Sequence, residues 1–433
     1  MITNPVLQAA LPLLSALEQQ HFEAVFVGGC VRDDRIGRPI TDVDIATSAK
    51  PEDVCRIFPR TIPTGLKHGT VTVLLDGTTY EVTTYRKESA YEAFRRPAEV
   101  EFITELTEDL RRRDFTINAM ALRGDGKLID PFGGLQDLQD GIIRCVGDAD
   151  ARFQEDALRM LRGIRFAAQF GESREPIFPR TWEAMLRRRD LLRHVAMERV
   201  GVELDKMMMG KRPDYAFDLL IHSGLLQRTK EQLTLPDPAW GDWRALIDSS
   251  RVNTGPLTLL SNPNERWAAF GLTRGMDEHH MESWFRALRF AGRRSAQICA
   301  VISFHRHWLA SVEAAGASDD SRLIDRLWMD QVIRFGRETT QTWLNMVREF
   351  EGMNPWGELA ERLQILLDQM PAASLKELAV NGNDLMRALR RSPGVWLHTC
   401  LQQLLRDAAS AVVPNNKQSL LQHAETLVSE EPL

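Results

Sequence analysis

This chain of 433 residues has few cysteines and no excess of positive charge. The five cysteines lie far apart and no Cys-x-x-Cys pair occurs. A zinc site and a disulfide framework are therefore both disfavoured, and a reducing compartment is expected. The formal net charge is −6, which excludes a protein that binds nucleic acid over a uniformly basic surface. Any RNA partner would have to bind a local basic surface.

Long hydrophobic runs and repeats are missing as well. No uninterrupted apolar stretch has the length that spans a membrane, and the segment Met1–Pro5 lacks a basic region followed by an apolar one. No fixed-period repeat or low-complexity tract occurs. We therefore expect a soluble, cytoplasmic protein without membrane contact. Nothing in the sequence indicates an obligate protein partner, and the length suggests two to four domains or a long modular body.

Strand signals are confined to about the first 150 residues. Short apolar runs predict strands at Ala24–Val27 and Asp42–Ala46, and β-branched runs around an Asp76-Gly77 turn predict a hairpin within Gly69–Tyr85. After about Arg152 the apolar residues recur with helical spacing. The pattern predicts an α+β protein with a small mixed α/β head, followed by an extended all-α body.

A glycine pair, an arginine and a spaced pair of aspartates stand out in the head. Gly28 and Gly29 follow the first strand, where they let the backbone turn and approach a ligand closely. Arg32 stands where a helix should begin, so its guanidinium and backbone N–H groups can face a phosphate. Strand periodicity places Asp42 and Asp44 on one face. Two carboxylates beside a triphosphate are suitable ligands for Mg²⁺.

Two further charged segments are candidates for nucleotide contacts. The run Arg111-Arg112-Arg113-Asp114 lies at or near the start of a helix, where it is either a solvated charge run or a triphosphate contact. On a helix, Asp156 and Arg159 are i,i+3 neighbours. They form either an ordinary ion pair that stabilises the helix by ~0.2–0.5 kcal/mol or a pair of side chains that recognises the base of a nucleotide. An acceptor-only carboxylate beside a donor-only guanidinium matches the hydrogen-bonding edges of cytosine and adenine.

These segments resemble the class II tRNA nucleotidyltransferases, the family of CCA-adding enzymes and bacterial poly(A) polymerases, with similarity to the wider polymerase β superfamily. The resemblance covers roughly residues 22–170 and is weak between about 230 and 370. Because no His-Asp dipeptide occurs, the chain looks like the Gram-positive type that lacks an HD domain. The matching segments are Val27–Asp33, Asp42–Thr47, His68–Val71, Glu81–Thr84, Arg112–Ala119, Asp130–Gly134 and Arg152–Arg159.

The resemblance implies a role for each matching residue. Asp42 and Asp44 would be catalytic and hold Mg²⁺, with Glu81 as a possible third carboxylate. Asp114 would hold the ribose or a neighbouring arginine. The residues implied to bind ATP or CTP are Gly29, Arg32, Arg113, Asp156, Arg159, Arg162 and Arg165.

The implied activity is template-independent addition of C, C and A to the tRNA 3′ end from CTP and ATP, with release of pyrophosphate. Residues 1–150 would form the polymerase β-like catalytic head and 151–230 a helical neck that selects the base. Residues 231–433 would form a helical body and tail that bind the tRNA acceptor stem and elbow. The loop Arg86–Pro97 would switch the pocket from C to A. The alternatives are an A-adding enzyme, a poly(A) polymerase and a non-catalytic RNA-binding protein.

Overall fold

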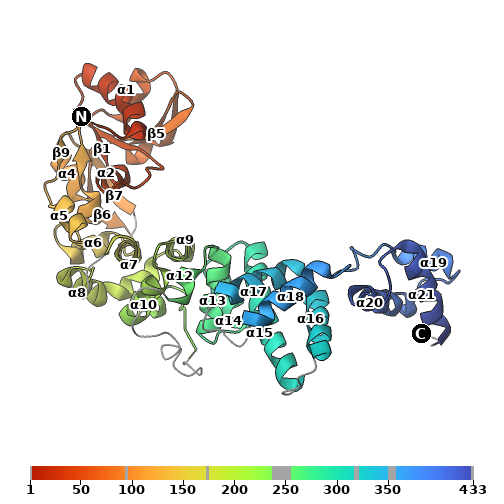
Figure 1. Cartoon of the computed structure of the whole chain (residues 1–433). Helices are drawn as coiled ribbons and strands as arrows, with labels where there is room; N and C mark the ends of the chain where they lie inside the picture. Colours follow the sequence, from red (N-terminus) through yellow and green to blue (C-terminus); the bar gives the residue numbers. More distant parts are fainter. Residues whose placement is uncertain are drawn as a thin grey trace. The chain divides into compact units, whose positions relative to one another are not determined.

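The computed structural model describes residues 2–92, 96–171, 175–236, 255–315, 321–349 and 357–430. By contacts, the chain divides into two compact units, Met1–Thr234 and Leu235–Leu433. Every strand in the described ranges belongs to the first unit, and the second is helical (Figure 1). None of the helices described is long and apolar enough to cross a membrane. The predicted α+β class, with a mixed sheet followed by helices, is confirmed.

The head contains a seven-stranded sheet with the order β3-β4-β5-β2-β1-β8-β9. Its neighbouring strands run antiparallel, except that β2 and β5 are parallel. A separate two-stranded sheet pairs β6 with β7. The strands are β1 Ala24–Val27, β2 Asp44–Thr47, β3 Thr61–Gly65, β4 Thr70–Leu75, β5 Thr78–Thr84, β6 Arg86–Glu92, β7 Arg96–Phe102, β8 Ala121–Leu122 and β9 Leu128–Ile129.

The predicted hairpin is present as β4 and β5. Leu75 pairs with Thr78, so Asp76 and Gly77 form the two-residue turn. Both turn residues have positive φ, 49° and 82°, as a type I′ turn requires, and this turn matches the right-handed twist of the flanking strands. Local turn chemistry therefore determines the register of this half of the sheet.

The central strand β1 is buried along its whole length because helices pack against it. Val25 and Val27 belong to one apolar cluster with Leu106 and Leu110 of α4, and α1 also contacts β1. Burial of all four β1 residues anchors the strand, so the turn that follows it is held in place. The helices of the first unit are α1 Pro5–Gln19, α2 Gly29–Arg35, α3 Pro51–Ile57, α4 Leu106–Arg111, α5 Gly134–Gln139, α6 Ala149–Glu155, α7 Leu158–Phe170, α8 Pro179–Arg188, α9 Met197–Met208 and α10 Pro213–Ser223, with 3-10 turns η1 Leu66–His68, η2 Thr116–Asn118, η3 Arg189–His194 and η4 Leu226–Arg228.

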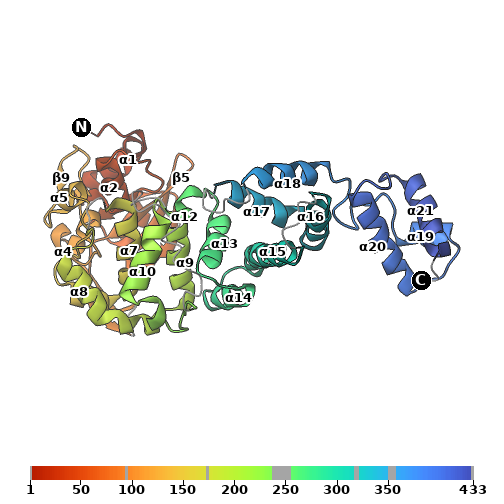
Figure 2. The ribbon, with the colours of Figure 1, turned by 60° about the horizontal axis from the view of Figure 1, so that its bottom comes forward.

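After the sheet, α7, α9 and α10 pack against one another, as both ribbon views show (Figures 1 and 2). Each presents an apolar stripe to its neighbours, for example Leu161 and Ile164 of α7 and Val200 and Leu204 of α9, which are all fully buried. The polar faces of α7 and α9 remain available for other contacts.

The second unit is built from helices around aromatic and leucine-rich cores. In its first part Trp343 is buried and donates from Nε1 to His305 Nδ1 at 2.9 Å. Near its end, Trp396 and Leu404 belong to a separate cluster of buried side chains. The helices are α12 Pro256–Leu259, α13 Pro263–Thr273, α14 Glu278–Ala287, α15 Gly292–Ala315, α16 Ser321–Phe335, α17 Arg337–Glu349, α18 Gly357–Gln369, α19 Gly382–Ala388, α20 Val395–Ala409 and α21 Lys417–Glu430.

Candidate active site

One cavity of about 640 Å³ in the first unit is lined by the nine residues that the sequence predicts to be catalytic or nucleotide-binding. Eight arginine and lysine side chains and four aspartates line it. An excess of guanidinium groups around a few carboxylates suits a polyanion that arrives with a divalent cation. The nine are Gly29, Arg32, Asp42, Asp44, Arg113, Asp156, Arg159, Arg162 and Arg165.

The turn after β1 brings the backbone close to two charged side chains. Gly28 has φ +73°, and a Cβ there would lie 3.1 Å from Arg113 Nη1 and 3.5 Å from Asp44 Oδ2. A larger residue would be strained in this conformation and would press on both groups. The helix α2 then begins at Gly29, so a helix does follow the glycine turn, but Arg32 is its fourth residue rather than its first, and the Arg32 N–H donates to Gly28 O.

Asp42 and Asp44 both reach the cavity, although β2 begins only at Asp44. Asp42 lies in the preceding segment, where Thr41 Oγ1 donates to its Oδ2 at 3.1 Å. The expected strand thus starts two residues later than predicted. In β2, Asp44 pairs with Val27 of β1 on one side and with Glu81 of β5 on the other.

The carboxylates of this site fit a divalent cation. Burial raises the pKa of Asp44 despite the nearby Arg113, and repulsion from Glu81 and Asp42 raises it further. A bound cation would relieve this unfavourable negative charge. In the described part of the chain, no three His, Cys, Asp or Glu side chains gather as a metal site, and Glu81 lies opposite Asp44 on the neighbouring strand. Two protein carboxylates with substrate phosphates are an ordinary ligand set for Mg²⁺.

A buried network joins Arg32 to the arginines of α7. Arg32 Nη1 donates to Asn118 Oδ1 at 2.6 Å, and Asn118 Nδ2 donates to Asp114 Oδ1 at 3.2 Å. Arg162 Nη2 lies 2.6 Å from Asp114 Oδ2. Although burial opposes its charge, Arg162 and Arg159 hold the pKa of Asp114 at about 2. Asp114 therefore remains ionised and fixes the guanidinium of Arg162 within the cavity.

Arg113 lines the cavity and, in the part of the chain that the structure describes, has one buried donor without a partner. Arg111 is the last residue of α4 and η2 begins at Thr116, so the arginine run joins two helices rather than opening one. Arg113 Nη2 lies 3.4 Å from Asp109 Oδ2, while its Nε is buried without a hydrogen-bond partner among the described residues. A buried donor without a partner is costly, and a phosphate oxygen would satisfy it.

The expectation of one helix through Asp156 and Arg159 is wrong. α6 ends at Glu155, and Asp156 has extended φ and ψ of −146° and 104°. Its Oδ1 accepts from Leu158 N at 3.1 Å at the start of α7, a local bond that competes with helix continuation. Arg159 Nη1 pairs with Glu155 Oε2 at 2.5 Å.

The side chain of Asp156 is held from a distant helix. Arg199 of α9 donates from Nη2 to Asp156 Oδ2 at 2.7 Å and from Nη1 to Oδ1 at 3.3 Å. On the same face of α9, Glu203 Oε2 lies 2.7 Å from Arg165 Nε. Glu203 is only 3% exposed, whereas Arg199 is partly exposed, so α9 supplies one partner for Asp156 just before α7 and a buried one for Arg165 within it.

Comparisons with known proteins agree with this arrangement. Residues 24–144 match the "Poly A polymerase head domain", 176–234 the "Probable RNA and SrmB- binding site of polymerase A", and 259–424 the "tRNA nucleotidyltransferase domain 2 putative". A CCA-adding enzyme of Bacillus velezensis is 36% identical over 412 residues, 95% of this chain and 96% of the relative. The chain belongs to the CCA-adding enzyme family.

Solved structures of CCA-adding enzymes extend the match. The Bacillus stearothermophilus CCA-adding enzyme in complex with CTP is similar with a TM-score of 0.78 and 32% identity, covering 99% of both chains. The Thermotoga maritima CCA-adding enzyme complexed with tRNA_CCA shares the fold at 20% identity and a TM-score of 0.66, over 99% of this chain and 97% of that chain. The family resemblance found in the sequence is thereby confirmed across the full chain.

Sequence reasoning did not single out three polar residues of this cavity: Asn118, Arg199 and Lys206. Asn118 lies inside a matching segment but has no charge to mark it. Arg199 and Lys206 belong to an amphipathic helix on which basic residues are usually solvent-exposed. The one available signal was Glu203, an acidic residue on the α9 face that packs against an arginine-rich helix.

Proposed function

We propose that this member of the CCA-adding enzyme family adds C, C and A in turn to the 3′ end of tRNA. CTP and ATP are the nucleotide substrates, and pyrophosphate is released at each step. The supporting observation is the meeting of Asp42 and Asp44 with seven nucleotide-binding candidates in one cavity. The relatives at 35–36% identity over nearly the whole chain are described as CCA-adding enzymes, which favours full CCA addition over the A-adding, poly(A)-polymerase and non-catalytic alternatives.

Asp42 and Asp44 hold Mg²⁺ in this proposal. When bound, the ion lowers the pKa of the attacking 3′-hydroxyl and stabilises charge on the leaving phosphates. The backbone at Gly29 stands at the start of α2 and faces the triphosphate. Arg113 offers its unsatisfied Nε to a phosphate oxygen. Arg32, fixed by Asn118 and paired with Asp33, presents an immobile guanidinium.

Asp156 and Arg159 select the base. The carboxylate accepts a hydrogen bond from the exocyclic amine of cytosine or adenine, and the guanidinium donates to the adjacent ring nitrogen. Uracil and guanine present the opposite pattern and leave buried groups unpaired, which discriminates strongly. Arg162 and Arg165 extend from the base position towards the phosphates, and Asp114 holds Arg162.

The wider organisation follows the same proposal. Residues 1–150 act as the catalytic head, 151–230 as the base-selecting neck, and 231–433 as the helical body and tail. The body binds the acceptor stem and elbow of tRNA by backbone shape and charge rather than by reading bases. We place the protein in the cytoplasm, where its tRNA substrate is matured or repaired.

One assay tests the proposal directly. Purified protein and Mg²⁺ are incubated with tRNA transcripts that end before CCA, after C and after CC, each with CTP, ATP or both. Complete CCA on the shortest transcript is the expected product. Addition of A to the CC transcript without addition of C to the shortest one would identify an A-adding enzyme. Long adenosine tails would identify a poly(A) polymerase, and no extension would identify a silent RNA-binding protein.

A further inference from the structure

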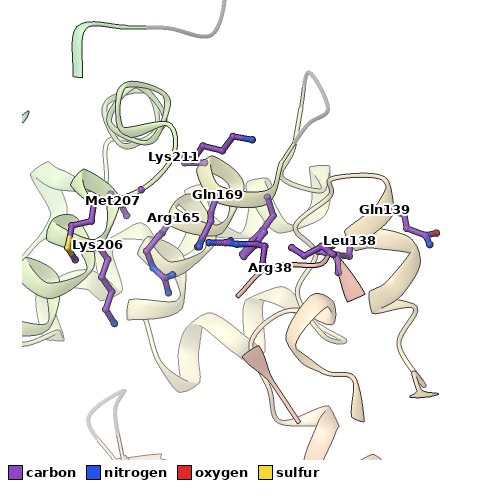
Figure 3. A pocket seen from close by; sticks show the side chains of 13 residues that line it. Arg38, Leu138, Gln139, Arg165, Gln169, Lys206, Met207 and Lys211 are labelled. Atoms are coloured by element: carbon purple, nitrogen blue, oxygen red, sulfur yellow. The ribbon is translucent and has the colours of Figure 1, made fainter. Parts of the chain in front are cut away.

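A second cavity, of about 770 Å³, lies beside the first within the same unit. Four segments build it: the turn after α2, the end of α5, the end of α7, and the end of α9 with the residues that follow. Figure 3 shows its labelled polar side chains, with Arg38 next to Gln169 and with Arg165 and Lys206 extending in the same direction. Four basic residues line it, and no aspartate or glutamate does: Arg38, Arg165, Lys206 and Lys211.

The four cations are only partly neutralised. Glu203 faces two of them, with its carboxylate oxygens 2.7 Å from Arg165 Nε and 3.8 Å from Lys206 Nζ. Arg38 lies over the Phe170 ring, 5.1 Å from its centroid, and with the Gln169 amide assigned so that its oxygen faces Arg38, this oxygen accepts from the Nη atoms at 2.8 and 3.0 Å. Neither partner of Arg38 is charged, so its positive charge is not neutralised by these contacts.

Arg38 and Lys211 therefore keep their positive charge exposed to the cavity. Among the described residues, neither side chain forms an ion pair with a carboxylate. In a protein with a net charge of −6, such a concentration of positive charge in a concave site favours binding of a polyanion.

The two cavities share two lining side chains. Arg165 and Lys206 line both the candidate active site and this second cavity. An anion released beside Arg165 can exchange its contacts there for contacts with Arg38 and Lys211. The proposed function releases one such anion at each addition, because attack of the 3′-hydroxyl on the α-phosphate breaks the bond to the β-phosphate and frees pyrophosphate.

We propose that the second cavity is a product site that binds pyrophosphate as it leaves the active site. The inference rests on the proposed function. A strand of RNA fits the lining less well, because single strands are usually held by bases stacked on free aromatic rings. Phe170 is the aromatic residue of this lining, and the guanidinium groups of Arg32 and Arg38 already lie over its ring at 4.5 and 5.1 Å.

Product inhibition by pyrophosphate tests this site. The variants Lys211→Gln and Arg38→Gln are compared with wild type in single-C addition at increasing pyrophosphate concentrations. We expect the inhibition constant of pyrophosphate to rise about tenfold in each variant, the loss of one charge-assisted contact, and Lys211→Arg to restore it. The KM for tRNA should not follow this rise. Lys127→Gln, which removes an exposed charge in the β8–β9 turn, is the matched control.

Equilibrium dialysis with labelled pyrophosphate and Mg²⁺ separates this inference from the proposed function. Wild type should bind one more pyrophosphate per chain than the Arg38→Gln/Lys211→Gln double variant. Equal binding, or unchanged inhibition constants, would overturn the product site. A rise in the KM for tRNA with unchanged pyrophosphate inhibition would assign the cavity to RNA instead. A wild-type protein that binds pyrophosphate but extends no tRNA would refute the proposed function while leaving the site in place.

Discussion

Arg199 holds the carboxylate of Asp156 through two hydrogen bonds, 2.7 and 3.3 Å long, from a helix 43 residues further along the chain. The carboxylate proposed to read the base is thus oriented by a side chain that does not itself need to touch the nucleotide. A bidentate guanidinium–carboxylate pair constrains both distance and plane. Selectivity should therefore depend on Arg199 as well as on Asp156.

Asp156→Ala should admit UTP or GTP, because the remaining site no longer offers an acceptor to the exocyclic amine. We expect selectivity for CTP over UTP to fall at least about tenfold, the effect of one lost charge-assisted hydrogen bond. This selectivity is measured by single-nucleotide incorporation with each of the four triphosphates. An equal loss of rate with all four nucleotides, at unchanged selectivity, would make the residue structural.

Arg199→Ala should relax selectivity in the same direction, and a double-mutant cycle shows whether it acts through Asp156. If Arg199 only positions the carboxylate, the double variant is no less selective than Asp156→Ala alone. Additive losses of selectivity would contradict this role. Glu198→Ala, an exposed residue next to Arg199 on α9, is the control and should keep wild-type selectivity.

Asp44→Asn should abolish addition of both C and A while tRNA affinity stays near wild type, because backbone phosphate contacts dominate RNA affinity. Filter binding and primer extension measure the two properties. Substantial residual C addition at saturating Mg²⁺ would remove Asp44 from the proposed metal site.

Asp44→Asn should also raise the Tm of the metal-free protein at neutral pH. Burial and the neighbouring Glu81 and Asp42 raise the pKa of Asp44, so ionising this group costs the folded state stability as pH rises above 3.8, the ordinary pKa of an aspartate. Asn removes that cost. The difference in Tm should shrink as pH falls towards 3.8, and Mg²⁺ should stabilise wild type more than the variant. Equal Tm values at neutral pH in EDTA would contradict this account.

Arg113→Lys should weaken nucleotide binding although the positive charge is kept, because lysine cannot replace the Nε donor that lies buried without a partner. We expect the KM for CTP and ATP to rise about tenfold, the effect of one charge-assisted hydrogen bond. The KM for tRNA should stay constant. Arg111→Lys, on an exposed residue at the end of α4, is the control.

The segment Arg86–Pro97 is not a plain loop: Arg86–Glu92 and Arg96–Phe102 pair as β6 and β7, and residues 93–95 lie outside the described ranges. Its proposed role in the switch from C to A stays a prediction. Arg86 and Phe102 are register partners, so residues 87–101 can be replaced by an Asn-Gly turn. The shortened protein should add C and C but not the terminal A. Loss of all additions would indicate a role in folding or general binding.

Features encoded by neighbouring residues could be predicted from the sequence. The Asp76-Gly77 turn produced the expected hairpin because both residues tolerate positive φ. The turn at Gly28 and the helix start at Gly29 followed from a buried strand ending in glycines. Seven of the nine site residues were identified from ordered motifs, each contained within a few consecutive positions, and Arg162 and Arg165 from their helical spacing after Arg159.

Tertiary structure decided which of those residues touch. Asp156 left the helix because its side chain bonds Leu158 N, and it met Arg199 only because α7 packs on α9. The pairing of Asp114 with Arg162 joins positions 48 residues apart. The second cavity depends likewise on four separate segments meeting in space. Local patterns determine turns and element ends, whereas partners of buried charges depend on which helix faces pack together, and packing is set by the whole chain.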